Sequence, residues 1–242
     1  MYFINQYTCS SYLTSLPRYA LNFKGIPYKT EWVDYPDIEP LCKNLGIPPT
    51  SKNADGSDRY TLPAIHDPST GVYISDSMLI AEYLEKTYPD TPQLFPHHTI
   101  ALQTMFEVAF GGSLDALWSF IILATSAKLR PRGAEYYRRT REKAFGKPIE
   151  DIAPTGDAAI AQWAKFKDGL GKVDEWYAKS GGDGPFLLGE TPSWGDIIVV
   201  SYLVWLRTTW GEDSSQWKDI SSWNGGRWAR IVEALKRYET IV

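Results

Sequence analysis

Asp76 and Ser77 begin the segment DSMLIAEYLEKTYPD, whose apolar spacing predicts a helix. Their side chains can cap the first turn, and the free N–H groups and dipole of such a helix attract a carboxylate. An Asp-Ser pair on its own is more often an ordinary N-cap than a ligand site. The sequence therefore offers an anion-binding helix start, with simple capping as the alternative.

A second motif is Leu62-Pro63, which stands inside a segment that otherwise reads as a strand. Proline removes a donor from the strand ladder and is normally excluded from a central strand. One hairpin between Pro63 and Asp76 would bring both motifs to the same end of a sheet, where a short peptide with a carboxylate could bind. An edge-strand proline with no role is the alternative.

The elements that must position these motifs follow from apolar patterning and from glycine and proline punctuation. The expected order is a strand at 2–4, a helix from Leu13 to Gly25, a strand at 28–33, a helix at 38–45, a polar loop at 51–59, strands at 61–67 and 71–75, and a helix at 76–88. This order predicts a mixed four-stranded sheet with helices on it, the thioredoxin-like arrangement. A proline at the start of the third strand is typically cis there, which exposes the N–H and C=O of Leu62 to an extended peptide.

After a proline-rich linker at 89–98, the pattern becomes helical. Helices are expected over 102–123, 133–145, 157–179, 194–208 and 226–239. We therefore predict an α/β thioredoxin-like domain at 1–92 and an all-α domain at 93–242. Gly111-Gly112 would weaken the first of these helices, which indicates a kink, a close backbone approach or room for a ligand.

Composition excludes several classes of partner. The net charge of −4 gives no overall electrostatic reason to bind nucleic acid or an acidic membrane surface, and the basic stretch at 130–147 reads as a solvated helix face. His66, His97 and His98 lack the spacing of a zinc site, so no metal is expected. Two cysteines and no long apolar run favour a soluble cytoplasmic protein.

Ser193 and Asp196 have the spacing of a capping box, in which each satisfies a free N–H group of the other's backbone. They belong to FLLGETPSWGD, which resembles the pattern of Gly followed by Pro-Ser/Thr-x-x-Asp in the cytosolic glutathione transferases. The segments RYALNFKGIPYKTEWVDYPDIEPLC, YTLPAIHDPSTG and SDSMLIAEYLEKTYPDTPQLFP resemble the fungal etherase-like, or fungal-specific A, serine-type class. The resemblance implies the glutathione transferase fold, glutathione as co-substrate and a cytoplasmic homodimer.

The resemblance also implies site residues. Leu62 and Pro63 would bind the backbone of glutathione, and Asp76 and Ser77 its γ-glutamyl end. The catalytic serine of this class lies seven residues before the arginine of Arg-Tyr-Ala-Leu, which gives Ser11. Its hydroxyl and the positive end of the first helix would favour the glutathione thiolate over the thiol.

Two neighbours of Ser11 are alternatives for the group that faces the glutathione sulfur. Ser10 could donate the same hydrogen bond, whereas Cys9 would form a mixed disulfide and make the protein a thiol transferase or deglutathionylase. The adjacent Tyr12, with Phe110, Leu114 and Trp118, is expected to line a hydrophobic co-substrate site.

The resemblance implies aromatic or phenolic substrates, in detoxification or in the cleavage of β-aryl ethers. A polyphenol carrier with little turnover and a regulatory protein that has lost the chemistry are the two non-enzymatic alternatives.

Overall fold

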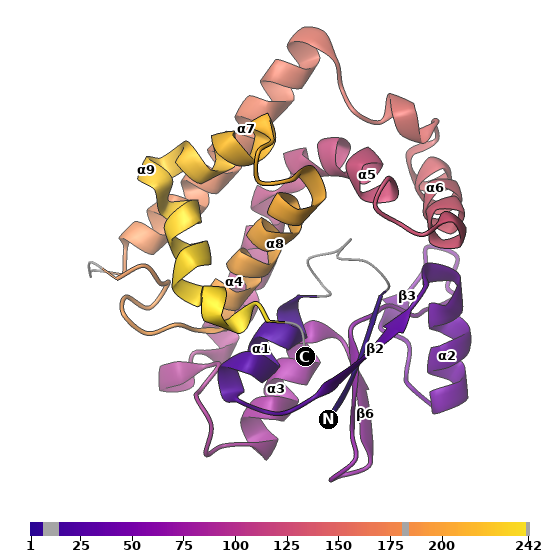
Figure 1. The fold of residues 1–242 in the computed structure, drawn as a ribbon, viewed down its shortest axis with the longest axis vertical. Coiled ribbons are helices and arrows are strands. Elements are labelled where there is room, and N and C mark those ends of the chain that lie inside the picture. Colours follow the sequence, from indigo (N-terminus) through magenta and orange to yellow (C-terminus); the bar gives the residue numbers. More distant parts are fainter. Residues whose placement is uncertain (7–14, 181–183, 241–242) are drawn as a thin grey trace.

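The computed structural model describes residues 1–6, 15–180 and 184–240, drawn as a coloured ribbon in Figure 1. A four-stranded sheet has the order β2-β1-β5-β6, with β1 parallel to β2 and antiparallel to β5. The strands of the N-terminal part are β1 (Tyr2–Gln6), β2 (Lys29–Val33), β3 (Ser51–Lys52), β4 (Asp58–Arg59), β5 (Ala64–Asp67) and β6 (Val72–Ser75). Its helices are α1 (Leu16–Lys24), η2 (Tyr35–Asp37), α2 (Ile38–Leu45) and α3 (Ser77–Thr87).

The predicted thioredoxin-like order is confirmed, with two local differences. The strand expected at 61–67 begins only at Ala64, because Pro63 cannot donate to the ladder. The loop expected at 51–59 contains the short hairpin of β3 and β4, in which Ser51 pairs with Arg59. Apolar patterning could not reveal these two strands, since both are solvent-exposed, polar and without an apolar face.

The C-terminal part is helical, as predicted. Its elements are η3 (Pro96–His98), α4 (Ile100–Ser113), η4 (Asp115–Leu117), α5 (Trp118–Ser126), α6 (Pro131–Phe145), η5 (Ile149–Asp151), α7 (Gly156–Ala178), α8 (Trp194–Trp210), α9 (Ser215–Leu235) and η6 (Lys236–Tyr238). Within the described part of the chain, no single helix is long and apolar enough to span a membrane, although α4 and the η4–α5 segment together, as a bent pair, have that length and composition.

Two helix predictions need correction. The helix expected at 102–123 ends at Ser113, and the chain bends by 41° before it continues through η4 and α5. A Cβ atom added at Gly111 or Gly112 would meet no described residue within 4 Å. A bend therefore follows this pair, but no backbone in the described ranges lies close to it. The last helix starts at Ser215 rather than at 226, because its first half precedes a break at Asn224 and Gly225, both with positive φ.

Helix α1 lies between the sheet and the helical part. Its buried residues Leu16, Tyr19, Ala20, Leu21 and Phe23 belong to one apolar cluster that extends from Phe3 and Ile65 in the sheet to Ile197 and Val200 in α8. A single continuous core therefore joins the two parts of the chain.

The polar side of α1 is fixed by the end of the chain. The side-chain amide of Asn22 donates to the backbone oxygens of Tyr238 and Thr240, at 2.8 and 2.9 Å. Lys24 donates to Glu85 at 2.9 Å and to the backbone oxygen of Pro92 at 3.1 Å, which ties α1 to α3 and to the linker. Helix α1 therefore contacts α3, α8 and η6, which are far apart in the sequence (Figure 1).

The predicted capping box is present at the start of α8. Asp196 is fully buried and accepts hydrogen bonds from the Ser193 N–H and hydroxyl, at 2.9 and 2.8 Å. It also accepts from the Tyr177 hydroxyl and the Leu187 N–H, at 2.9 and 2.8 Å, two contacts that the local spacing could not predict. Burial raises the pKa of Asp196 to about 6 against the opposing effect of these hydrogen bonds. Asp196 therefore connects α7, α8 and the loop between them.

The hairpin of β5 and β6 is anchored to α3 through Asp67. This carboxylate, only 2% exposed, accepts hydrogen bonds from the Tyr83 and Tyr88 hydroxyls, at 2.7 and 2.5 Å, and from Ser69. Burial raises the pKa of Asp67, but the hydrogen bonds from Tyr88, Ser69 and Tyr83 outweigh burial and lower it to about 2. The hairpin that carries Pro63 at one end and leads to Asp76 at the other is thus held in place.

Candidate functional site

The two motifs found in the sequence lie side by side. The Leu62–Pro63 peptide bond is cis, as predicted, and the Pro63 carbonyl accepts a hydrogen bond from the Asp76 N–H at 3.3 Å. No hydrogen bond joins the backbone of Leu62 to another described residue. The N–H and C=O of Leu62 therefore have no partner in the described part of the chain, and Leu62 precedes the proline whose carbonyl contacts the start of α3.

Asp76 is the N-cap of α3, with a positive φ of 84°. Its Oδ1 accepts from the N–H groups of Met78 and Leu79, at 2.9 and 3.2 Å. Its backbone oxygen accepts from the Ile80 N–H. Among the first-turn amides, only that of the buried Ser77 has no partner in the part of the chain described, so this N–H can receive an anion.

Glu107 on α4 is a carboxylate near Asp76 that the sequence did not single out. Burial and, to a lesser extent, the negative charge of Asp76 raise the pKa of Glu107. Its one hydrogen-bond donor among the described residues is the Trp194 indole N–H, at 3.5 Å. A cationic group bound near Asp76 and Glu107 would stabilise both carboxylates.

A cavity of about 1010 Å³ lies between the two parts of the chain and includes Leu62 in its wall. Its thioredoxin-like wall is formed by Tyr35, Pro36, Ile38, Glu39, Pro40, Lys43, Asn53, Asp58, Arg59, Tyr60, Thr61 and Leu62. Its helical wall is formed by Trp118, Tyr136, Tyr137, Thr140, Arg141, Ala144 and Trp205. One wall is thus mostly polar, and the other carries four aromatic rings.

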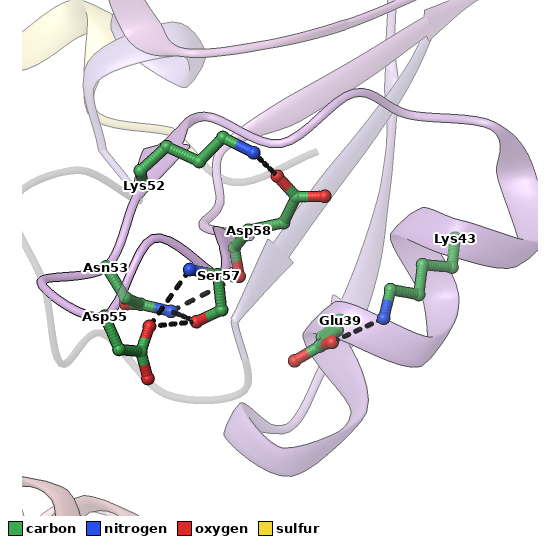
Figure 2. Close-up of polar contacts among 7 residues, drawn as sticks. All are labelled: Glu39, Lys43, Lys52, Asn53, Asp55, Ser57 and Asp58. Atoms are coloured by element: carbon green, nitrogen blue, oxygen red, sulfur yellow. Dashed lines mark hydrogen bonds and ion pairs between the residues drawn. The ribbon is translucent and has the colours of Figure 1, made fainter.

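Figure 2 shows polar side-chain contacts around the β3–β4 hairpin and α2, which contribute to the polar wall. Asn53 donates to the Ser57 hydroxyl at 3.0 Å, and Asp55 accepts from the N–H and hydroxyl of Ser57, at 3.0 and 2.6 Å. Lys52 pairs with Asp58 across the β3–β4 hairpin. These contacts hold the hairpin that presents Arg59 to the cavity.

A neighbouring ion pair belongs to α2, where Lys43 donates to Glu39 at 2.6 Å (Figure 2). Both side chains are exposed, and Lys43 also lies 5.6 Å from the ring centre of Tyr60. Lys43 and Arg59 are thus two cations beside Leu62 that could bind a carboxylate of a peptide.

The aromatic wall includes one of the positions predicted for the co-substrate site and lacks two others. Trp118 lines the cavity, with its ring 5.9 Å from that of Trp205. Phe110 and Leu114 are only 1% and 2% exposed and do not line it; they pack in the core, where the Phe110 ring lies edge-on to Tyr202 at 5.1 Å. The predicted residues Cys9, Ser10, Ser11 and Tyr12 lie outside the described residues.

Contacts between η2 and α6 close one side of the cavity. Arg132 forms a bidentate ion pair with Asp37, at 2.8 and 2.7 Å, and the rings of Tyr35 and Tyr136 stack at 6.2 Å. Helix α6 approaches so closely that a Cβ atom at Gly133 would lie 2.2 Å from an oxygen of Asp34. The helical wall is therefore fixed relative to the polar wall.

The described ranges contain neither a group of side chains suited to a metal ion nor a reactive thiol. No group of three or more His, Cys, Asp or Glu side chains there could hold a metal ion. Cys42 is 1% exposed, and burial raises the pKa of its thiol, which disfavours the reactive thiolate.

Comparisons with known proteins match both parts of the chain. Residues 15–87 match the family described as glutathione S-transferase, N-terminal domain, and residues 101–238 match glutathione S-transferase, C-terminal domain. The glutathione S-transferase-like protein ustS of Aspergillus flavus is 33% identical over 231 residues, covering 90% of this chain and 80% of that protein.

Two solved fungal structures are similar over the whole chain. The glutathione S-transferase CsGST63524 of Ceriporiopsis subvermispora, crystallised with glutathione, is 43% identical with a TM-score of 0.93, covering 100% of this chain and 98% of that one. Glutathione transferase GSTFuA3 of Phanerochaete chrysosporium is 38% identical with a TM-score of 0.92 and the same coverage.

Proposed function

Because the chain belongs to the glutathione S-transferase family, we propose that it activates glutathione as a thiolate and transfers it to aromatic or phenolic electrophiles. The observation that carries this proposal is the cavity that has Leu62, with no backbone hydrogen bond in the described part of the chain, on one wall and four aromatic rings on the other. We place the boundary between the glutathione-binding part and the helical part at residues 92 and 93.

The chemistry is a displacement at carbon. Ser11 donates a hydrogen bond to the glutathione sulfur, and the thiol proton passes to solvent, which leaves the thiolate. The sulfur forms a bond to the electrophilic carbon as the bond to the leaving group breaks, and the leaving group departs with the electron pair. In a β-aryl ether the leaving group is a phenolate; in an aryl halide it is the halide ion.

Glutathione is bound along the polar wall. Its backbone pairs with Leu62 beside Pro63. Its γ-glutamyl carboxylate accepts a hydrogen bond from the Ser77 N–H. Its α-ammonium group lies near the carboxylates of Asp76 and Glu107, whose mutual repulsion it relieves. Its glycyl carboxylate lies near Lys43 and Arg59.

We expect Asp76→Asn to weaken glutathione binding about tenfold or more, because a hydrogen bond to a charged group contributes about 1.5–3 kcal/mol. Asparagine caps helices as well as aspartate does and tolerates positive φ, so α3 should remain intact, whereas Asp76→Ala would also remove the cap. The measurement is titration calorimetry with glutathione, and Asp90→Asn in the exposed linker is the matched control. Unchanged affinity in the Asp76 variant would remove this residue from the site.

The co-substrate lies against Trp118 and, in our proposal, Tyr12, while Phe110 and Leu114 support this wall from the core. The size of the cavity and its aromatic wall also suit a polyphenol carrier. Titration of a phenolic ligand with and without glutathione, alongside turnover of the same ligand, separates a carrier from a catalyst in detoxification or ether cleavage.

We also propose a cytoplasmic homodimer, supported by an exposed apolar stripe. Leu102, Met105 and Val108 are 67%, 69% and 74% exposed on one side of α4, and Leu79 on α3 is 54% exposed. A self-complementary patch of this kind is typical of a twofold dimer interface.

Val108→Glu is expected to convert the dimer to a monomer at micromolar concentration, because a twofold interface would bury two unpaired carboxylates. Light scattering after size exclusion gives the molar mass. Ile160→Glu on α7, at a residue that is 71% exposed, is the control and should remain dimeric. A monomeric wild type, or a dimer that survives Val108→Glu, would contradict the proposed interface.

A further inference from the structure

The cavity holds two guanidinium groups that have no carboxylate partner among the described residues. Arg59 and Arg141 line it from opposite walls, and neither forms an ion pair with any residue in the described ranges, whereas Lys43 is paired with Glu39. Cations in a half-enclosed site are stabilised by anions, so each of these positions favours a negatively charged group.

Glutathione accounts for one of these positions only. Arg59 stands on β4, close in sequence to Leu62 and on the same wall, where the glycyl carboxylate lies in the proposed function. Arg141 stands on α6, on the aromatic wall that faces the co-substrate. The second substrate is therefore the molecule that brings an anion to Arg141.

Arg141 is held in place by an aromatic ring. Its Cζ lies 4.4 Å from the ring centre of Tyr137, a side chain only 5% exposed. Burial raises the pKa of the Tyr137 hydroxyl, and the positive charge of Arg141 acts in the opposite direction. A guanidinium on an aromatic face keeps N–H donors for a carboxylate, which it can bind in a bidentate manner.

Other arginines of α6 are engaged elsewhere. Arg132 pairs with Asp37, and Arg138 pairs with Glu150 through two hydrogen bonds, at 2.9 and 2.6 Å. Arg139 is exposed, lies 5.6 Å from the ring centre of Tyr136 and does not line the cavity. Arg141 is therefore distinguished from these three by facing the cavity without an ion pair.

We propose that the co-substrate is an aromatic carboxylate, whose ring lies against Trp118 and Trp205 and whose carboxylate binds Arg141. This inference rests on the proposed function, since it assigns the cavity to an electrophile that reacts with glutathione.

The test compares chlorodinitrobenzoate with the matching chlorodinitrobenzamide, from both of which the glutathione thiolate displaces chloride. The ratio of their kcat/KM values, each divided by its uncatalysed rate constant, is the preference for the carboxylate. Arg141→Met should lower this preference about tenfold or more, the effect of one lost hydrogen bond to a charged group. Arg141→Lys, which keeps the charge without the bidentate geometry, should lower it less, and Arg139→Met should leave it unchanged.

An unchanged preference in Arg141→Met would overturn the proposal. So would a higher KM for glutathione with an unchanged preference, because Arg141 would then bind the tripeptide. If the wild type converts neither substrate, the proposed function fails, and binding of naphthoate and naphthamide, measured by calorimetry, decides the role of Arg141 alone. Loss of naphthoate binding in Arg141→Met with retained naphthamide binding supports the site; equal losses or none reject it.

Discussion

Ser11→Ala is expected to lower kcat/KM for conjugation of chlorodinitrobenzene to glutathione by about 100-fold, the effect of removing one donor from a developing or bound anion. Without the hydroxyl, the pKa of the bound thiol should move toward the ordinary value of about 8.5, so less thiolate is present at neutral pH. Glutathione binding itself should change little. The measurement is the initial rate as a function of pH, where the deficit should shrink as the pH rises above the thiol pKa.

Matched variants at the neighbouring positions decide between the three candidates. Ser10→Ala and Cys9→Ala should keep conjugation near the wild-type rate if Ser11 faces the sulfur. Disulfide reduction with a mixed disulfide of glutathione is assayed in parallel. If Cys9→Ala abolishes disulfide reduction and the wild type shows no conjugation, the protein is a thiol transferase and the assignment of Ser11 is wrong.

Asp196→Ala should lower the free energy of unfolding by about 3–5 kcal/mol, a loss comparable to breaking a buried charged pair. The variant leaves four donors without their acceptor, three of them buried, on Tyr177 and Ser193, and one part-buried, on Leu187. Unsatisfied buried donors are more costly than the hydrogen bonds themselves are stabilising. Urea unfolding followed by tryptophan fluorescence measures the change.

Asp219→Ala provides the control for this experiment. Asp219 also accepts one hydrogen bond, from the Trp163 indole at 2.9 Å, but the contact is exposed, and its loss should cost well under the effect at Asp196. A change at Asp196 no larger than that at Asp219 would show that water satisfies the four donors, and the buried network would then not be the main support of the start of α8.

Local patterns in the sequence predict most of the fold. The order of strands and helices follows from apolar alternation and from glycine and proline, because each signal acts within a few residues. The capping box of Ser193 and the proximity of Pro63 to Asp76 were predictable for the same reason, since one box and one hairpin are local. The end of α4 at Ser113 was not predictable, because apolar spacing continues across the bend.

The cavity residues were harder to predict because they depend on tertiary packing. Phe110 has helical spacing with Leu114, yet the packing of α4 against α7 and α8 turns both side chains into the core. Arg141 and Tyr137 belong to a stretch whose charge indicated a solvated face, and only the contact of α6 with η2 places them over the polar wall. A resemblance between sequences gives the kind of site, whereas the rotation of each helix decides which side chains line it.

The contacts of α1 with α8 and with the end of the chain have a consequence for synthesis on the ribosome. At about 5–20 residues per second, α1 leaves the ribosome roughly ten seconds or more before α8 and η6 exist to cover it. Its apolar face is exposed for that interval, when chaperones can bind it. The proline-rich linker thus separates two parts that differ in architecture but cannot complete their folding independently. We expect the N-terminal part, residues 1–92, to aggregate when it is produced alone.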